Sequence, residues 1–160
     1  MKIKRIAALL LCAVLLFSFS GCKKEHPKYS AAELCNMISR DLFTTQKLTV
    51  IENEQLTAYF PFSGDLLKEW RVAVSDENEK PFVSAVFVAK DSDSEKIIMD
   101  SINSFISQTA ARLKNLSDAE YNKISSRLVY KLDNAVILVI TDDYPAAEKY
   151  LKDLGAKEYK

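Results

Sequence analysis

The sequence predicts a single α+β domain in which an antiparallel sheet of about four strands carries helices packed on one face. Two nearly apolar runs, VSAVFVA at 83–89 and AVILVIT at 135–141, have the length and branched side chains of buried strands. Each run follows a shorter strand candidate and precedes an acidic helix cap, so the chain reads as two ββα units. A further helix is expected in front of them.

That N-terminal helix is predicted at about 30–43. Ser30 and Glu33 stand three positions apart, which is the spacing of a capping box, and Thr44 and Thr45 follow the last helical residue. The next stretch, 46–62, is ambiguous, because 48–51 and 56–60 fit either short strands or ordered loop.

A short helical turn is expected from Gly64 through Trp70, and it leads into the first ββα unit. This unit has a short strand at 71–75, a polar loop at 76–81 and the apolar strand at 83–89. Its helix is predicted at about 94–115, where apolar residues recur every three or four positions and form a stripe that would face the core.

The second unit begins with a shorter helix opened by Ser117 and Glu120, again with capping-box spacing. A strand at 128–132 alternates apolar and polar residues, and Asp133-Asn134 provides a two-residue turn into the second apolar strand. The last helix follows Asp142-Asp143 and is expected to end just before Gly155.

The first 21 residues have the layout of a secretory signal. A basic start is followed by the apolar run 6–17 and by small residues. This run is shorter than the roughly 20 residues that a membrane-spanning helix requires. Phe19-Ser20-Gly21-Cys22 resembles the bacterial lipobox, although Phe19 replaces the usual Leu. The resemblance implies a diacylglycerol on the Cys22 sulfur and cleavage before Cys22. An ordinary secretory signal, cut after a small residue such as Ser20, is the alternative.

The division of the chain follows from this signal: 1–21 is the lipoprotein signal peptide, 22–29 the lipidated cysteine with a polar tether, and 30–160 the α+β domain. The tether would hold the domain at the outer face of the cell membrane, since eight residues reach at most about 26 Å. Lys23, Lys24 and Lys28 could contact anionic head groups, or they could simply be solvated.

The charge balance argues against a nucleic-acid-binding protein. The chain has 22 basic and 22 acidic residues, and removal of the signal leaves 19 and 22, a net charge of −3. Of the three cysteines, Cys12 leaves with the signal and Cys22 would carry the lipid. Cys35 is therefore left without a disulfide partner, and its helical phase predicts a small buried side chain.

The combined pattern resembles a known family. A lipobox and short tether precede a strand ending in VFVAKD, then a long helix, the Tyr121 segment and the closing VILVITDDYPAAEKYL. This arrangement is similar to that of bacterial lipoproteins of the "domain of unknown function 4358" type, found mainly in Gram-positive anaerobes. The resemblance implies an extracytoplasmic address and an α+β fold. It implies no activity, because the family has none that can be carried over.

No catalytic set stands out in the sequence. The only histidine, His26, lies in the tether, where a general base would not be held in place. One histidine and one free cysteine are too few for a zinc site, and the mature chain lacks a glycine-rich phosphate loop. We therefore expect no catalytic residues, no metal and no cofactor besides the covalent lipid.

The aromatic segment before the sheet is the remaining candidate site. If Tyr59, Phe60, Phe62, Trp70 and Arg71 were exposed together, they would form a patch for a partner protein or a cell-wall component. The bland alternative is that they close one end of the core.

The leading hypothesis is a membrane-anchored, non-enzymatic domain that binds an envelope partner. A small-ligand or peptide-binding lipoprotein accessory to a transporter is one alternative. A small envelope enzyme that uses paired carboxylates is another.

Overall fold

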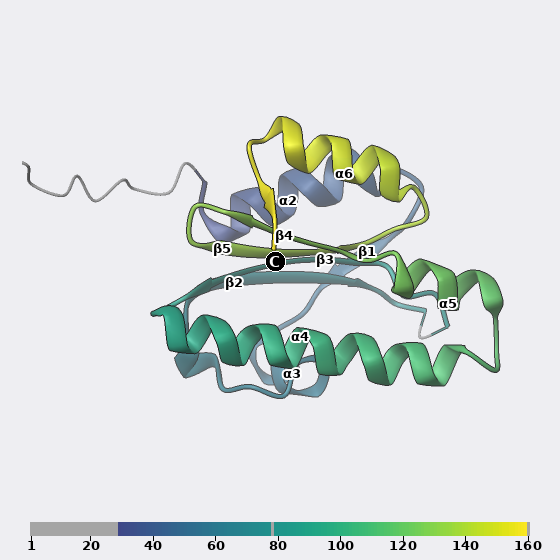
Figure 1. Cartoon of the computed structure of the whole chain (residues 1–160), viewed down its shortest axis with the longest axis horizontal. Coiled ribbons are helices and arrows are strands. Elements are labelled where there is room, and N and C mark those ends of the chain that lie inside the picture. The colour runs from purple at the N-terminus through teal and green to yellow at the C-terminus, as the bar shows by residue number, and fades with distance from the viewer. Residues whose placement is uncertain (1–28, 78, 160) are drawn as a thin grey trace, which may run out of the picture.

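The computed structural model describes residues 29–77 and 79–159, which form one α+β domain with three layers (Figure 1). The predicted lipid site at Cys22 and the tether up to Lys28 lie outside the described residues. The elements, in chain order, are α2 (Ala31–Leu42), β1 (Leu48–Val50), α3 (Asn53–Tyr59), η1 (Gly64–Leu66), β2 (Leu67–Ser75), β3 (Val83–Ala89), α4 (Ser92–Leu113), α5 (Asp118–Ser125), β4 (Leu128–Leu132), β5 (Ala135–Ile140), α6 (Tyr144–Asp153) and β6 (Lys157–Glu158).

The sheet is antiparallel throughout and has the strand order β1-β2-β3-β5-β4-β6. Both predicted hairpins, β2–β3 and β4–β5, are present, and β3 pairs with β5 in the centre. The sheet has six strands rather than about four, because a short strand is added at each edge. Each added strand has only two or three residues, too few to show a period of alternation in the sequence.

Helices cover both faces of the sheet, so the expectation of helices on one face is wrong. In Figure 1, α2 and α6 lie above the sheet, whereas α3, α4 and α5 lie below it. Two separate hydrophobic clusters fill the two interfaces. Helices are needed on both faces because the central strands are buried on both. Every residue of β3 and β5 is buried, so neither strand has a face exposed to water.

The predicted cap residues form hydrogen bonds at the starts of their helices, and of the two predicted capping boxes the one at Ser30 and Glu33 is complete. The Ser30 side chain accepts a hydrogen bond from the Glu33 amide, and the Glu33 carboxylate accepts one from the Ser30 amide. Asp91, Ser117 and Asp143 cap α4, α5 and α6 through their side-chain oxygens.

The two predicted turn residues also have the backbone that the sequence requires. Asp133 has a φ of 53° in the β4–β5 turn, and Gly155 has a φ of 90° after α6. Both values lie in the left-handed region, which Gly and Asp tolerate better than most residues.

The segment before β2 differs in part from its prediction. A strand is present at 48–50, but residues 53–59 form α3, where a short strand or an ordered loop was expected at 56–60. Trp70 belongs to β2, because the 3-10 turn ends at Leu66 and Trp70 pairs with Phe87 of β3. Pairing with a central strand has overridden the local helical pattern here.

The connections at the two ends of the domain differ in character. Ala31 begins α2 at the end where β2 starts, and its amide donates to Glu69 Oε2 at 3.1 Å. The opposite end, called the distal end below, carries the connections at 43–47, 76–82, 114–117 and 141–143. The helix α2 therefore begins at the end away from these loops (Figure 1).

Candidate binding site at the distal end

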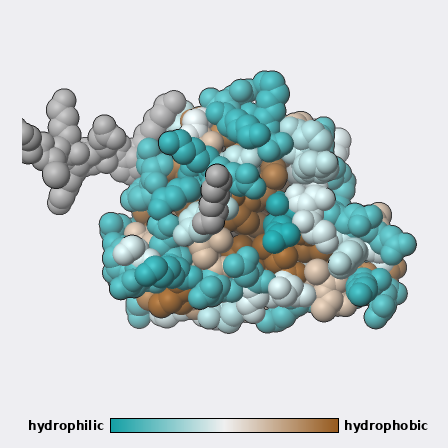
Figure 2. Space-filling view, in the orientation of Figure 1, coloured by the Kyte–Doolittle hydropathy of each residue, from teal (hydrophilic) through white to brown (hydrophobic). Residues whose placement is uncertain are grey.

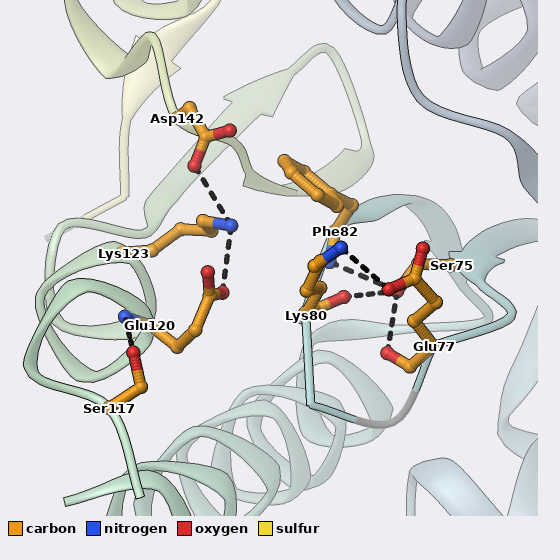
Figure 3. Close-up of polar contacts among 8 residues, drawn as sticks. All are labelled: Ser75, Glu77, Lys80, Phe82, Ser117, Glu120, Lys123 and Asp142. Carbon is orange, nitrogen blue, oxygen red and sulfur yellow. Dashed lines mark hydrogen bonds and ion pairs between the residues drawn. The ribbon is translucent and has the colours of Figure 1, made fainter.

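A buried lysine lies at the centre of the distal end. Lys123 of α5 has a side chain that is only 5 % exposed. Its Nζ lies 2.7 Å from Glu120 Oε2, 2.8 Å from Asp142 Oδ1 and 3.8 Å from the centre of the Phe82 ring (Figure 3). Removing an ammonium from water is costly unless it is paired, and here two carboxylates and an aromatic face supply that pairing.

The residues around this lysine enclose a hollow of about 580 Å³, called the Lys123 hollow. Two further ion pairs lie on its wall: Lys47 Nζ is 3.7 Å from Asp76 Oδ2, and Lys80 Nζ is 2.7 Å from Glu77 Oε2. The full lining, with four acidic and three basic side chains, is Thr45, Gln46, Lys47, Ser75, Asp76, Glu77, Lys80, Phe82, Glu120, Lys123 and Asp142.

The β2–β3 loop is fixed by hydrogen bonds at its base. The Ser75 hydroxyl accepts from the Phe82 amide at 3.4 Å and lies within hydrogen-bonding reach of the carbonyl oxygens of Glu77 and Lys80. Figure 3 shows this loop facing α5 across the hollow. The wall that carries Glu77 and Lys80 is therefore positioned by the end of β2 and the start of β3.

A second hollow of about 570 Å³ lies between α3 and the C-terminal half of α4, and is called the Tyr59 hollow. It is lined by Thr57, Ala58, Tyr59, Pro61, Phe105, Gln108, Thr109 and Arg112. A narrow hollow of about 50 Å³ shares Tyr59, Phe105, Thr109 and Arg112 with it.

The same narrow hollow shares Ser75, Glu77 and Phe82 with the Lys123 hollow. The linings of the three hollows therefore overlap, and the group of three is called the trough.

The predicted aromatic patch does not form as one exposed surface. Phe60 and Phe62 are 0 % and 5 % exposed, so for both rings the alternative holds that they close one end of the core. The Phe60 ring packs 5.1 Å from Phe87 and 4.9 Å from Phe105, measured between ring centres. Trp70 is half-buried against the same core.

The other two members of the predicted patch are also separated. Tyr59 is half-buried and reaches the surface as part of the trough wall. Arg71 is half-buried on β2, and its Nε is buried without a hydrogen-bond partner. Of the five predicted residues, only Tyr59 lines the trough.

The sequence analysis did not find the Lys123 cluster. Glu120 was noted as a capping residue, but its carboxylate pairs with Lys123 instead, one helical turn further along. The sequence offered only a lysine next to Ile124 in a short helix, and nothing in that pattern indicates that its side chain is buried. Asp142 comes from a different loop, and no sequence spacing links it to Lys123.

A second ionic cluster lies at the edge of the sheet near the C-terminus. Lys131 Nζ is 2.7 Å from both carboxylate oxygens of Glu95, and the Tyr159 hydroxyl donates to Glu95 Oε1 at 2.9 Å. Burial opposes ionisation of Glu95, but these hydrogen bonds outweigh burial and lower its pKa. The cluster fastens β4 and the C-terminal segment to α4, beside a hollow of about 630 Å³.

Figure 2 shows this face of the molecule, where hydrophobic surface reaches the outside along the seam between the sheet and α4. A smaller hollow of about 510 Å³ lies in the seam and is lined in part by Met99, Val129 and Tyr159. The printed ion pair on this face, between Lys131 and Glu95, joins β4 to α4, which favours a fastening role for this face.

The described residues offer little for catalysis. Among residues 29–77 and 79–159, no group of three or more His, Cys, Asp or Glu could hold a metal ion. Cys35 is fully buried, and burial raises the pKa of its thiol, which keeps it protonated and unreactive. Glu120 and Asp142 converge as paired carboxylates would, but Lys123 lies between them and forms an ion pair with each.

Comparison with known proteins provides no relative from which a function could be transferred. No family model, no curated protein and no solved structure matches the chain. Within the described part of the chain, no helix is both long enough and apolar enough to cross a membrane.

Proposed function

We propose that the chain is an extracytoplasmic lipoprotein, anchored through a diacylglycerol on Cys22, whose domain binds a protein of the cell envelope without catalysing a reaction. The N-terminal layout supports the address, and the resemblance to the "domain of unknown function 4358" lipoproteins supports the same address. Under this proposal the chain contacts the membrane through its lipid and one envelope protein through its domain.

The observation that carries the binding role is the position of the trough. It opens beside the distal loops, while the chain enters the domain at the other end, beside Glu69. A short tether at that end leaves the distal loops turned away from the membrane. Loops on a rigid scaffold are where binding sites are most often found.

The anchor is tested by following the protein in cells. Cys22→Ala should shift the chain from the membrane fraction to the medium or the soluble fraction, and should abolish incorporation of an alkyne-labelled fatty acid. Cys35→Ala is the matched control, because the Cys35 thiol is buried and should accept no lipid. Fatty-acid labelling that persists in Cys22→Ala would rule out this anchor.

The binding role is tested by crosslinking in living cells with the anchored protein, followed by mass spectrometry. One reproducible protein partner that is lost with Cys22→Ala is expected. A panel of anchored but unrelated lipoproteins supplies the background, and a partner list equal to that background would refute the proposal.

An accessory that carries a small ligand is the second candidate. The hollow of about 630 Å³ beside Glu95 falls in the range of roughly 300–1,000 Å³ that is typical of small-molecule sites. A thermal-shift screen with amino acids, short peptides and sugars tests it, and a ligand that raises the melting temperature in a saturable way would favour this candidate.

A further inference from the structure

We propose that the Tyr59 hollow is the anchoring point for the envelope protein and receives one of its tyrosine or tryptophan side chains. This inference rests on the proposed function, because it specifies the chemistry by which the partner is recognised. The fixed walls of the hollow, its lack of free charge and its place in the fold support it.

The hollow has an aromatic wall that the core holds in place. The Phe105 ring of α4 is half-buried and lines the hollow. Its ring centre lies 4.9 Å from that of Phe60, which is fully buried and packs in turn on Phe87 of the central strand β3. Since close-packed interiors resist displacement, the exposed part of the Phe105 ring is a preformed surface for another ring.

The hollow offers no free charge to an occupant. None of its eight lining residues is acidic, and its single cation, Arg112, already has an interaction partner. A charged group that entered would lose its water without gaining a countercharge, which is unfavourable. The Lys123 hollow is different, because seven of its eleven lining residues are charged. An uncharged occupant is therefore expected in the Tyr59 hollow.

One side chain of the lining is placed to accept a hydrogen bond. Gln108 Nε2 donates to the Ser104 hydroxyl at 2.9 Å, and among the described residues the Gln108 Oε1 has no partner. A tyrosine or tryptophan has an apolar ring with one donor at its tip. Its ring would lie against Phe105 while its O–H or N–H donates to Gln108 Oε1.

The same lining is poorly suited to a glycan. Four of its eight residues are apolar or aromatic, namely Ala58, Tyr59, Pro61 and Phe105. A sugar ring brings several hydroxyl groups, and each one that is buried without a hydrogen bond is costly. One aromatic side chain with a single donor makes a smaller demand, and tyrosine and tryptophan are enriched among the residues that dominate protein–protein binding.

The hollow also lies where the proposed function places the partner. It is formed by α3 and the C-terminal half of α4, and α4 leads into the distal connection at 114–117. Both helices lie below the sheet, on the face opposite α2 (Figure 1). A partner at the distal end can therefore reach the hollow without contacting α2.

A variant that fills the hollow tests its role in living cells. Thr57→Trp places a ring of the chain itself at this site, and Glu54→Trp makes a matched change at an exposed position of α3 outside the lining. Capture of the envelope protein by an amine-reactive crosslinker should fall about tenfold in Thr57→Trp, as expected on loss of a hot-spot contact. Glu54→Trp should retain wild-type capture, and melting curves of both variants verify that they are folded.

Free probes test the chemistry of the occupant. Saturation-transfer NMR measures binding of blocked amino acid amides to the mature lipidated protein in nanodiscs. N-acetyltyrosinamide and N-acetyltryptophanamide should bind saturably in the low millimolar range. N-acetylphenylalaninamide should bind about fivefold more weakly than the tyrosine amide, because it lacks the donor. Gln108→Leu should abolish this difference, whereas Ser107→Leu, an exposed neighbour outside the lining, should preserve it.

The outcomes separate this inference from the proposed function. The assignment of the hollow is overturned by unchanged capture in Thr57→Trp, by an equal loss in Glu54→Trp, by equal binding of the phenylalanine and tyrosine amides, by no saturable binding of the aromatic amides, or by tighter binding of N-acetylglucosamine. If the wild-type chain still captures an envelope protein in any of these cases, the proposed function stands and only the hollow is wrongly assigned.

Discussion

Removal of the Lys123 charge tests whether the buried ion cluster holds the distal end together. In Lys123→Met, the side-chain volume is retained and the carboxylate of Glu120 loses its partner. Breaking a fully buried ion pair costs about 3–5 kcal/mol. Lys123 and Glu120 have side chains that are 5 % and 17 % exposed, so the pair lies close to that limit.

The loss of unfolding free energy expected for Lys123→Met can be divided between the two carboxylates that pair with Lys123. Asp142 is 61 % exposed, so water would solvate its charge after the substitution, and Asp142→Asn should cost less than about 1 kcal/mol. Glu120 is the group left with an uncompensated charge. We therefore expect Lys123→Met to lose about 3 kcal/mol, which corresponds to roughly 10 °C in melting temperature for a domain of this size.

Urea unfolding followed by the fluorescence of Trp70, the only tryptophan, measures these differences. The double variant Lys123→Met with Glu120→Met removes both charges and should be more stable than Lys123→Met alone, because no unpaired carboxylate remains. Additive losses in the double variant, or a cost for Asp142→Asn equal to that of Lys123→Met, would refute the reasoning.

Three further predictions concern pH and the backbone. Hydrogen bonds lower the pKa of Glu95 in the folded protein. The stability that the ionised Glu95 contributes is therefore present above the unfolded pKa near 4.5 and is lost as pH falls. In Glu95→Gln, acid unfolding should lack this pH-dependent loss of stability. Burial and the hydrogen bond to Asp41 raise the pKa of Tyr150 to about 12. That stabilisation is complete below pH 10 and is lost towards pH 12, so alkaline unfolding of Tyr150→Phe should be less steep. Gly155→Ala should cost about 1 kcal/mol in urea unfolding, because φ is 90° there and no neighbour would crowd the new methyl group.

Much of the fold could be predicted because local signals agree with the packing. Capping residues such as Ser30 and Asp91 form hydrogen bonds within the helix they begin, so sequence spacing reveals them. The runs at 83–89 and 135–141 marked the central strands for a similar reason, since burial of a whole strand leaves an uninterrupted apolar segment.

The same two runs also indicate that the sheet is covered on both faces, whereas the sequence analysis expected helices on one face. A strand with water on one face alternates polar and apolar residues, and neither run alternates. Full burial of β3 and β5 requires helices on both faces, as the structure shows. Trp70 was misplaced for a different reason, because its strand depends on pairing with Phe87, a partner seventeen positions away.

The site was harder to predict because its parts come from separate loops. The trough combines α3, the β2–β3 loop, α4 and α5, and no motif in the sequence links them. The pairing of Lys123 with Asp142 depends on the end of α5 lying beside the end of β5, which only the fold determines.

Site-specific photocrosslinking in living cells tests the central claim most directly. A photoreactive phenylalanine analogue placed at Gln108, an exposed position in the trough wall, should crosslink one envelope protein in the anchored chain. The same analogue at Asn36, exposed on α2 on the opposite face of the sheet, should not. A partner captured from Asn36 but not from Gln108, or no partner from either position, would contradict the account.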